Sequence, residues 1–320
     1  MAELKIDDCR LSDCKKSRPP RSPHVTTKRL DPRLYQIAVL AGLLLFGLTV
    51  LDFDLTIAQI VLTIGTAVVT QLTCARLVAL GGDTGIRSAL ISALSLCLLL
   101  RTDVLLVAVA AAGIAVGSKF VVRVGGKHLF NPTNGAIVAL LALATALPAL
   151  DLSVWVSPGQ WGNTAFFLLL MGCLGTIVVT RAARADVTFA FLLTWIGLLF
   201  YRAWSLGDPI AIPLHRLQNG ALLLFAFFMI SDPKTTPDSR RGRVLFGALV
   251  ACGAYYVQFK LFHTNGLLWS LAVCSVMVPL IDWLLPGTRY AWTGARSLES
   301  AHETPPAACR PAGAVRPAVF

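Results

Sequence analysis

The residue types best able to do chemistry in this sequence are concentrated in one polar and basic block between two long apolar stretches. Residues 228–243 read FMISDPKTTPDSRRGR and contain Asp232, Lys234 and three arginines. Pro233 cannot continue a helix, so an apolar helix is expected to end near Ser231. An acid at the carboxyl end of a helix is unfavourably placed relative to the helix dipole. We therefore expect Asp232 to have a partner, Lys234 or an arginine of the block. An ordinary positively charged loop is the alternative interpretation.

A second polar stretch, residues 119–135, reads KFVVRVGGKHLFNPTNG. Asn131 suits a helix N-cap and Pro132 the first helical position. Asn134 and Gly135 are tolerated more easily at the start of an apolar helix where they meet something polar. A helix amino terminus that carries amide side chains can hold carbonyl or phosphate oxygens. The pattern is thus compatible with ligand contact and with simple capping and packing.

The composition that surrounds these two stretches indicates an all-α integral membrane protein. Hydrophobic residues make up 56% of the 320 and charged residues 14%, and the charges lie between the apolar stretches. A bilayer core needs about 20 apolar residues per helix, and lipid cannot satisfy an exposed backbone. The sequence predicts about ten transmembrane helices, of which the third is short: 34–52, 55–80, 86–100, 103–122, 132–150, 162–180, 186–204, 210–230, 243–260 and 265–285.

The distribution of basic residues predicts the orientation of these spans. With the amino terminus inside, 24 lysines and arginines fall on the cytoplasmic side and 4 on the other. Basic residues are enriched in cytoplasmic loops, so both termini are expected in the cytoplasm. The asymmetry also explains much of the net charge of +11, and nucleic-acid binding is not needed to account for it.

The chain is expected to form one membrane domain with two polar ends. We predict a basic cytoplasmic arm at 1–33, a transmembrane domain at 34–290 and a disordered cytoplasmic tail at 291–320. Ten spans divide into two sets of five, and an odd number per set gives two inverted halves. The eight cysteines form no metal-binding pattern, so no metal site is predicted.

Several segments, in order, resemble the NqrB/RnfD family, which comprises one membrane protein of Rnf electron-transport complexes and its relative in the sodium-pumping NADH:quinone reductase. The resemblance covers roughly residues 22–290. It is carried by these segments: Ser22-Pro23-His24, Gly126-Lys127-His128-Leu129-Phe130-Asn131-Pro132, Ala226-Phe227-Phe228-Met229-Ile230-Ser231-Asp232-Pro233, Gly242-Arg243-Val244-Leu245-Phe246-Gly247 and Val278-Pro279-Leu280-Ile281-Asp282.

The resemblance implies a ten-helix fold of two inverted halves that takes part in flavin-linked electron transfer coupled to ion movement. It implies a non-covalent riboflavin or FMN near the cytoplasmic side, between the two polar stretches. Asn131 and Asn134 would hydrogen-bond the isoalloxazine edge, since amides both donate and accept. The predicted cofactor-binding residues are Lys127, Asn131, Thr133, Asn134, Asp232 and Lys234.

The chain departs from the family pattern after the fifth span. Family members carry an outward-facing insertion there, with a threonine esterified to FMN, whereas residues 151–161 contain no threonine. No covalent FMN is therefore expected. Shortened members of this kind resemble those that accompany enediyne-type natural-product biosynthesis, which implies transport or redox support of such a pathway.

Two function classes follow from the resemblance and the composition. The first is a redox subunit of a bacterial inner-membrane complex that acts with other redox subunits or quinone and has no catalytic residue of its own. The second is a cofactor-free transporter or channel for a small neutral or cationic solute. The span centres carry no charged residues, which argues against a relay of carboxylates within this subunit.

Overall fold

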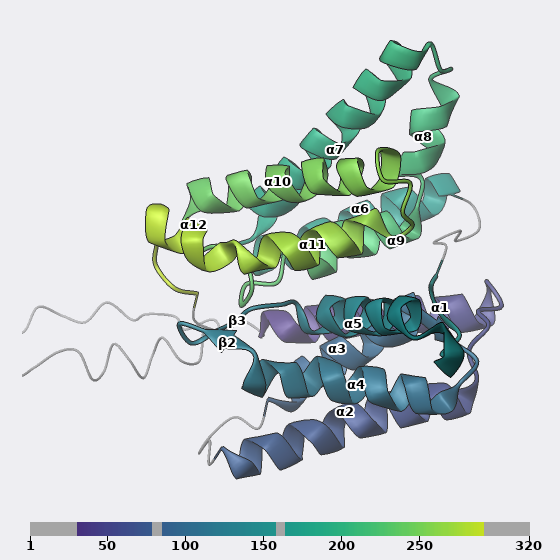
Figure 1. The fold of residues 1–320 in the computed structure, drawn as a ribbon, viewed down its shortest axis with the longest axis vertical. Helices are drawn as coiled ribbons and strands as arrows, with labels where there is room; N and C mark the ends of the chain where they lie inside the picture. The colour runs from purple at the N-terminus through teal and green to yellow at the C-terminus, as the bar shows by residue number, and fades with distance from the viewer. Residues whose placement is uncertain (1–30, 79–84, 158–163, 291–320) are drawn as a thin grey trace, which may run out of the picture. The chain divides into compact units, whose positions relative to one another are not determined.

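The computed structural model describes residues 31–78, 85–157 and 164–290 (Figure 1). The predicted tail at 291–320 and all but residues 31–33 of the predicted arm lie outside these ranges. Asp31 caps the first helix by accepting a hydrogen bond from the Arg33 backbone N–H at 2.9 Å, and Pro32 occupies the first helical position. This sequence is a standard start for a helix.

The first set of helices corresponds to the first five predicted spans. Short strands β1 (Leu100–Thr102), β2 (Arg123–Val124) and β3 (Lys127–His128) interrupt it. The helices are α1 (Pro32–Thr49), α2 (Ile57–Leu77), α3 (Ile86–Leu99), α4 (Leu105–Val121) and α5 (Pro132–Ala146). The third span is short, as predicted: 14 residues reach about 21 Å at 1.5 Å each.

The second set contains two broken spans. The predicted eighth span comprises three pieces, and the tenth is bent by 49° between α11 and α12. The elements are α6 (Thr164–Arg181), α7 (Ala185–Leu206), α8 (Ala211–Leu217), α9 (Gly220–Leu224), the π-helical turn Phe225–Met229, α10 (Arg240–Phe259), α11 (Gly266–Val276) and α12 (Val278–Leu284).

The architecture is that of an all-α membrane protein with two small two-stranded antiparallel sheets in the described residues. β1 pairs with β4 (Val154–Val156), beside the 3-10 turn Pro148–Leu150, and β2 pairs with β3. Among the described residues, α1, α2, α7 and α10 are long and apolar enough to cross a membrane, and the bent pair makes a fifth. The other predicted spans coincide with shorter or broken helices, so the number ten stays a prediction.

The two sets have matching internal neighbours. In the first set α2 packs against α3 and α4, α1 against α3, and α4 against α5. In the second set α7 packs against α8 and α10, α6 against α9 and the π-helical turn, and α10 against α11. Contacts between α5 and α11 and between α1 and α6 join the sets, which form two layers in Figure 1.

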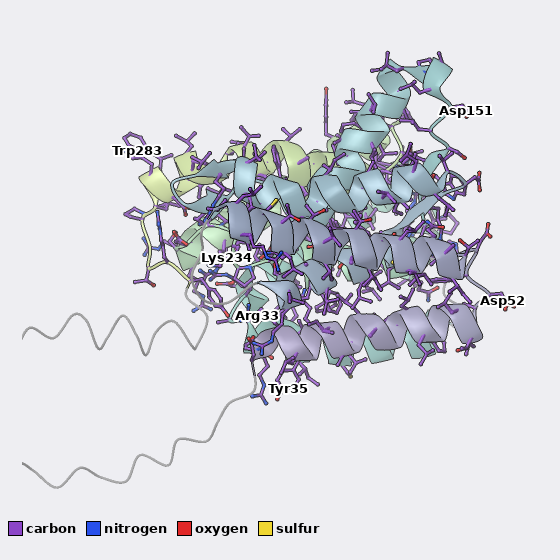
Figure 2. All side chains as sticks on the ribbon, turned by 90° about the horizontal axis from the view of Figure 1, so that it is seen from below. Arg33, Tyr35, Asp52, Asp151, Lys234 and Trp283 are labelled. Carbon is purple, nitrogen blue, oxygen red and sulfur yellow. The ribbon has the colours of Figure 1, made fainter. Side chains whose placement is uncertain are left out.

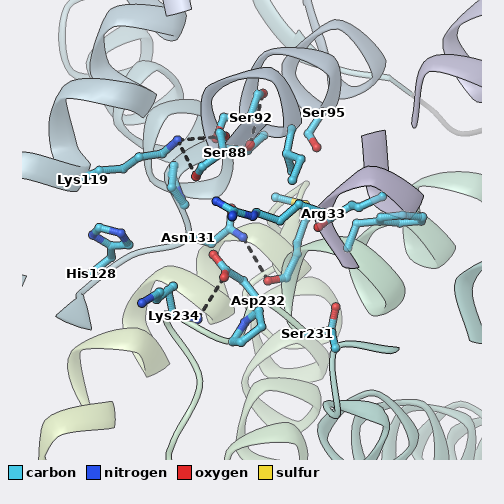
Figure 3. Close-up of a pocket in the computed structure, with 18 of the residues that line it drawn as sticks. Arg33, Ser88, Ser92, Ser95, Lys119, His128, Asn131, Ser231, Asp232 and Lys234 are labelled. Atoms are coloured by element: carbon cyan, nitrogen blue, oxygen red, sulfur yellow. Dashed lines mark hydrogen bonds between the residues drawn. The ribbon is translucent and has the colours of Figure 1, made fainter. Parts of the chain in front are cut away.

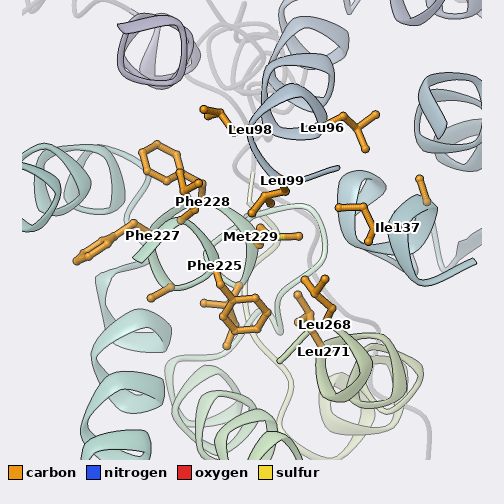
Figure 4. Packing of buried hydrophobic residues seen from close by; sticks show 14 of the residues in the cluster. Leu96, Leu98, Leu99, Ile137, Phe225, Phe227, Phe228, Met229, Leu268 and Leu271 are labelled. Carbon is orange, nitrogen blue, oxygen red and sulfur yellow. The ribbon is translucent and has the colours of Figure 1, made fainter. Parts of the chain in front are cut away.

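A buried apolar cluster fills the space where the layers meet (Figure 4). Phe225, Met229 and their neighbours in the π-helical turn face Leu98 of α3 and Leu268 of α11. These side chains are at most 5% exposed. Because lipid is as apolar as they are, close packing is what favours their association. The cluster thus lies next to the buried residues of the two polar stretches.

Helices α7 and α10 approach each other closely at Gly247. A Cβ added there would lie 2.7 Å from the Val187 carbonyl oxygen and 3.0 Å from the Phe191 backbone nitrogen. These are backbone atoms, so the helices themselves would have to separate. Gly197 of α7, in contrast, has nothing within 4 Å of an added Cβ.

We predict that Gly247→Ala destabilises the protein by about 1–3 kcal/mol, the usual range for overpacking. Thermal unfolding in detergent measures this as a lower midpoint. Gly197→Ala is the matched control and should leave the midpoint unchanged or raise it, because alanine favours helices. Equal midpoints for the two variants would contradict the close approach of α7 and α10.

Candidate functional site

A cavity of about 330 Å³ lies between the two polar stretches singled out in the sequence. It is at the same end of the helices as Arg33 and Lys234, away from Asp52 and Asp151 (Figure 2). Both helix sets line it, and the first set contributes residues of α1, α3, α4 and α5. Its polar and aromatic lining residues include Arg33, Gln36, Gln71, Ser88, Ser92, Ser95, Lys119, Phe120, Arg123, His128, Asn131, Thr133, Phe228, Ser231, Asp232 and Lys234.

Asn131 begins α5 and connects it to the second helix set. Its Oδ1 accepts from the Asn134 backbone N–H at 3.2 Å, which is the predicted N-cap bond. Its Nδ2 donates to the Met229 carbonyl oxygen at 3.1 Å (Figure 3). The side chain lies on the cavity wall, and both ends of its amide are engaged by the backbone. Asn131 therefore shapes the cavity.

Asn134 is fully buried and is not among the residues that line the cavity. Its Nδ2 donates to the Leu268 carbonyl oxygen in α11 at 3.2 Å, and its Oδ1 has no hydrogen-bond partner in the described part of the chain. The polar contact that the sequence implied for Asn134 is thus found with another helix. Thr133 does line the cavity, and its hydroxyl donates to the Ser92 carbonyl oxygen at 3.4 Å.

Asp232 and Lys234 lie on the opposite wall, where the π-helical turn ends. Ser231 donates back to the Phe227 carbonyl oxygen at 2.5 Å, and Pro233 stops the helix. Asp232 Oδ1 accepts from the backbone N–H of Lys234 at 3.0 Å, so the expected partner is this amide. Burial lowers the pKa of the Lys234 ammonium, and the Asp232 charge partly offsets this.

Lys127, the remaining predicted site residue, does not line this cavity and forms an ion-pair cluster. Its Nζ donates to Asp282 Oδ2 at 2.7 Å, to Asp238 Oδ1 at 3.0 Å and to the Thr236 carbonyl oxygen at 2.8 Å. Asp282 also accepts from the Asp238 backbone N–H at 2.7 Å. The cluster fastens the β2–β3 hairpin to the loop before α10 and to α12.

Sequence reasoning missed Lys119 and His128 as site residues, although both lie in the polar stretch that it selected. Lys119, in the last turn of α4, is 4% exposed and donates to the Ser88 carbonyl oxygen at 3.0 Å and to Ser88 Oγ at 3.3 Å. Ser88, Ser92 and Ser95 line the cavity at helical spacing along α3. That serine spacing is the signal that could have revealed this wall.

The pKa of the His128 imidazole is shifted by its surroundings in the site. Burial lowers its pKa below the ordinary value, and the nearby charges of Arg123, Lys119 and Lys234 lower it further, whereas Asp232 opposes them. His128 Nδ1 is buried and has no hydrogen-bond partner in the described ranges. At neutral pH the side chain is therefore an uncharged group with a free nitrogen beside the cavity.

Comparison with known proteins bears on the part of the chain that forms the second wall. The sequence profile of the NQR2, RnfD, RnfE family matches residues 148–290. The matched segment contains the Asp232 loop and α7 to α12, and the match confirms the resemblance over this part of the chain.

Similar relatives are named as the D subunit of an ion-translocating oxidoreductase complex. The protein of Citrobacter koseri is 31% identical over 125 residues, and that of Pectobacterium atrosepticum 32% over 130 residues. The protein of Escherichia coli O1:K1 / APEC is 32% identical over 125 residues. Each match covers 39% of this chain and 34% of the relative, so it spans about a third of the relatives' length.

We predict that His128 makes the protein less stable as the pH falls. Its folded-state pKa lies below that of the unfolded chain, about 6.5, so below that pH the unfolded state binds the proton more readily. The thermal midpoint of the wild type, measured relative to His128→Gln, should therefore decrease from about pH 8 to about pH 5. Parallel profiles for the two proteins would show that burial does not lower this pKa.

Proposed function

We propose that this chain is a membrane electron-transport subunit that holds riboflavin or FMN non-covalently in the cavity between the polar stretches. The observation that carries the proposal is that the Asn131 helix start and the Asp232 loop line one cavity. These are the two places where the family resemblance puts the flavin. The family match over residues 148–290 and the name of the relatives support the electron-transport role.

The cavity residues fit a flavin in size and in chemistry. Ligand pockets occupy roughly 300–1,000 Å³, and this cavity holds about 330 Å³. Phe120 and Phe228 provide apolar surface for a ring system, while Ser95 and Asp232 offer polar groups to its edge. A bound flavin would supply one- and two-electron transfer. The residues of the chain would orient it and exclude water.

We propose that other redox subunits and quinone exchange electrons with this subunit in a bacterial inner membrane. The relatives are named as subunits of an ion-translocating oxidoreductase complex, which supports such partners. Covalent FMN is not part of the proposal, because residues 151–161 hold no threonine. A role in enediyne-type biosynthesis stays a prediction from the resemblance.

We also propose that the scaffold consists of ten membrane segments in two inverted halves, with both termini in the cytoplasm. The recurring neighbours support this: α2–α4 corresponds to α7–α10, and α4–α5 to α10–α11. The contacts α1–α6 and α5–α11 each join equivalent elements, as expected near a pseudo-twofold axis. The broken spans would cross the membrane as composite segments, with their free backbone groups satisfied by neighbouring helices.

Flavin content tests the functional proposal. Protein purified from riboflavin-replete cells should show visible flavin absorbance, and Ser95→Phe, which fills the cavity, should lower its flavin content about ten-fold or more. Ser205→Phe on the exposed end of α7 is the matched control and should keep its flavin. Replacing Asn131 or Asn134 is less informative, because both amides hold the fold.

Colourless wild-type protein would contradict the flavin proposal. If that colourless protein also supported solute flux in liposomes without a reductant, cofactor-free transport on the same scaffold would replace it. The basic lining of the cavity makes a cationic solute the least suitable cargo for such transport.

Cysteine accessibility tests the ten-span topology. In a cysteine-free background, Asp151→Cys and Thr264→Cys should react with an impermeant maleimide in intact cells. Gly125→Cys and Arg241→Cys, both at exposed positions, should react only after the cells are opened, since these positions lie at the end of the helices predicted to face the cytoplasm. Labelling of Gly125→Cys in intact cells would reverse the proposed orientation.

A further inference from the structure

The charges that line the cavity do not balance among the described residues. Its cations are Arg33, Lys119, Arg123 and Lys234, and Asp232 is its carboxylate. The Arg33 guanidinium pairs with Asp31 at 2.7 Å, just outside the cavity lining. Three cations then face one carboxylate, which leaves an excess of two positive charges. An excess of positive charge around one cavity favours the binding of an anion.

Among these cations, Lys119 has the greatest need of a counter-charge because it is buried. An ammonium carries three N–H donors, and the two hydrogen bonds of Lys119 go to the oxygens of one residue, Ser88. Within residues 31–290, as far as the structure describes them, no carboxylate oxygen lies within ion-pair distance of its Nζ. A buried charge needs a counter-charge, and an anion in the cavity would supply one.

His128 and Lys234 extend this wall into a set of donors. Figure 3 shows both side chains on the same side of the cavity as Lys119, with His128 between the two lysines. His128 Nδ1 has no partner in the described chain. As a neutral imidazole, His128 can donate one hydrogen bond, and the tautomer that carries its proton on Nδ1 would do so at the cavity.

We propose that Lys119, His128 and Lys234 bind the phosphate of a phosphomonoester. The proposal rests on the proposed function, and it assigns the non-covalent flavin of this chain as FMN and not riboflavin. A phosphomonoester carries about −1.5 to −2 charges at pH 7, which matches the excess of two positive charges. Lysine ammonium groups are common phosphate ligands, acting as point charges.

Flavin titration tests the assignment. Flavin-free protein, prepared from riboflavin-limited cells, is titrated separately with FMN and riboflavin while flavin fluorescence is followed. FMN should bind at least about ten-fold more tightly than riboflavin, the difference expected from charge-assisted hydrogen bonds to phosphate. Inorganic phosphate should compete with FMN and leave riboflavin binding unchanged.

Two variants and a control locate the phosphate contact. Lys119→Gln and Lys234→Gln should each weaken FMN binding about ten-fold while riboflavin binding changes less than about two-fold. Lys234 lies in a loop, so its variant keeps the test valid if Lys119→Gln fails to fold. Lys260→Gln, an exposed lysine at the end of α10, should change neither affinity.

The outcomes separate this inference from the proposed function. Equal affinities for FMN and riboflavin would overturn the phosphate site and leave the flavin proposal intact. Loss of both affinities in Lys234→Gln would also overturn it, because the lysine would then serve the ring. Binding of neither flavin would overturn both proposals. Competition by nanodiscs of phosphatidic acid, but not by inorganic phosphate, would assign the site to a lipid headgroup instead.

Discussion

The amides of Asn131 and Asn134 connect the two helix sets, and the shape of the cavity depends on them. Each donates from Nδ2 to a backbone carbonyl of the second set, that of Met229 or of Leu268. Inside a membrane a polar group without a partner costs several kcal/mol, whereas interhelical hydrogen bonds are individually modest. The amides therefore fix where α5 meets the second set. That position places the Asp232 loop opposite the start of α5.

Interruptions of regular helix create the site. The π-helical turn ends the broken eighth segment just before Asp232, and α5 begins at Asn131 directly after the β2–β3 hairpin. Ion pairs then hold the loops at this end: Lys127 joins Asp238 and Asp282, and Arg243 holds Asp186 through bonds of 2.8 and 2.9 Å. Partly buried ion pairs add little net stability, so their main effect is to fix loop positions.

Much of the helical layout could be predicted from the sequence, because lipid imposes a length and an apolar composition on each segment. The start of α5 was also predictable, since asparagine at the N-cap followed by proline at the first helical position is a common helix start. The π-helical turn of the eighth segment was not, because an apolar run has the same composition whether its helix is regular or π-helical. The bend of the tenth segment, in contrast, is marked in the sequence by Pro279 in the first turn of α12. The π-helical turn is buried in one cluster with distant residues such as Leu98 and Leu268, and the local sequence does not show these neighbours.

The predicted site residues likewise fall into two groups, those that line the cavity and those that make structural contacts. Thr133, Asp232 and Lys234 were predicted and line the cavity with Asn131, whereas Asn134 and Lys127 lie beyond its wall in structural contacts. Sequence alone could not separate these uses, since the partners of Lys127 are more than 100 positions away. Lys119 was hidden for a related reason: its burial depends on the α3–α4 contact and on Ser88.

Hydrogen–deuterium exchange with and without added flavin tests most directly whether the two polar stretches form one binding site. The account predicts slower exchange in both segments at once, residues 119–135 and residues 228–236, with little change in the loops near Asp52 and Asp151. Protection confined to one of the two segments, or protection of neither, would contradict a site built jointly by the two helix sets.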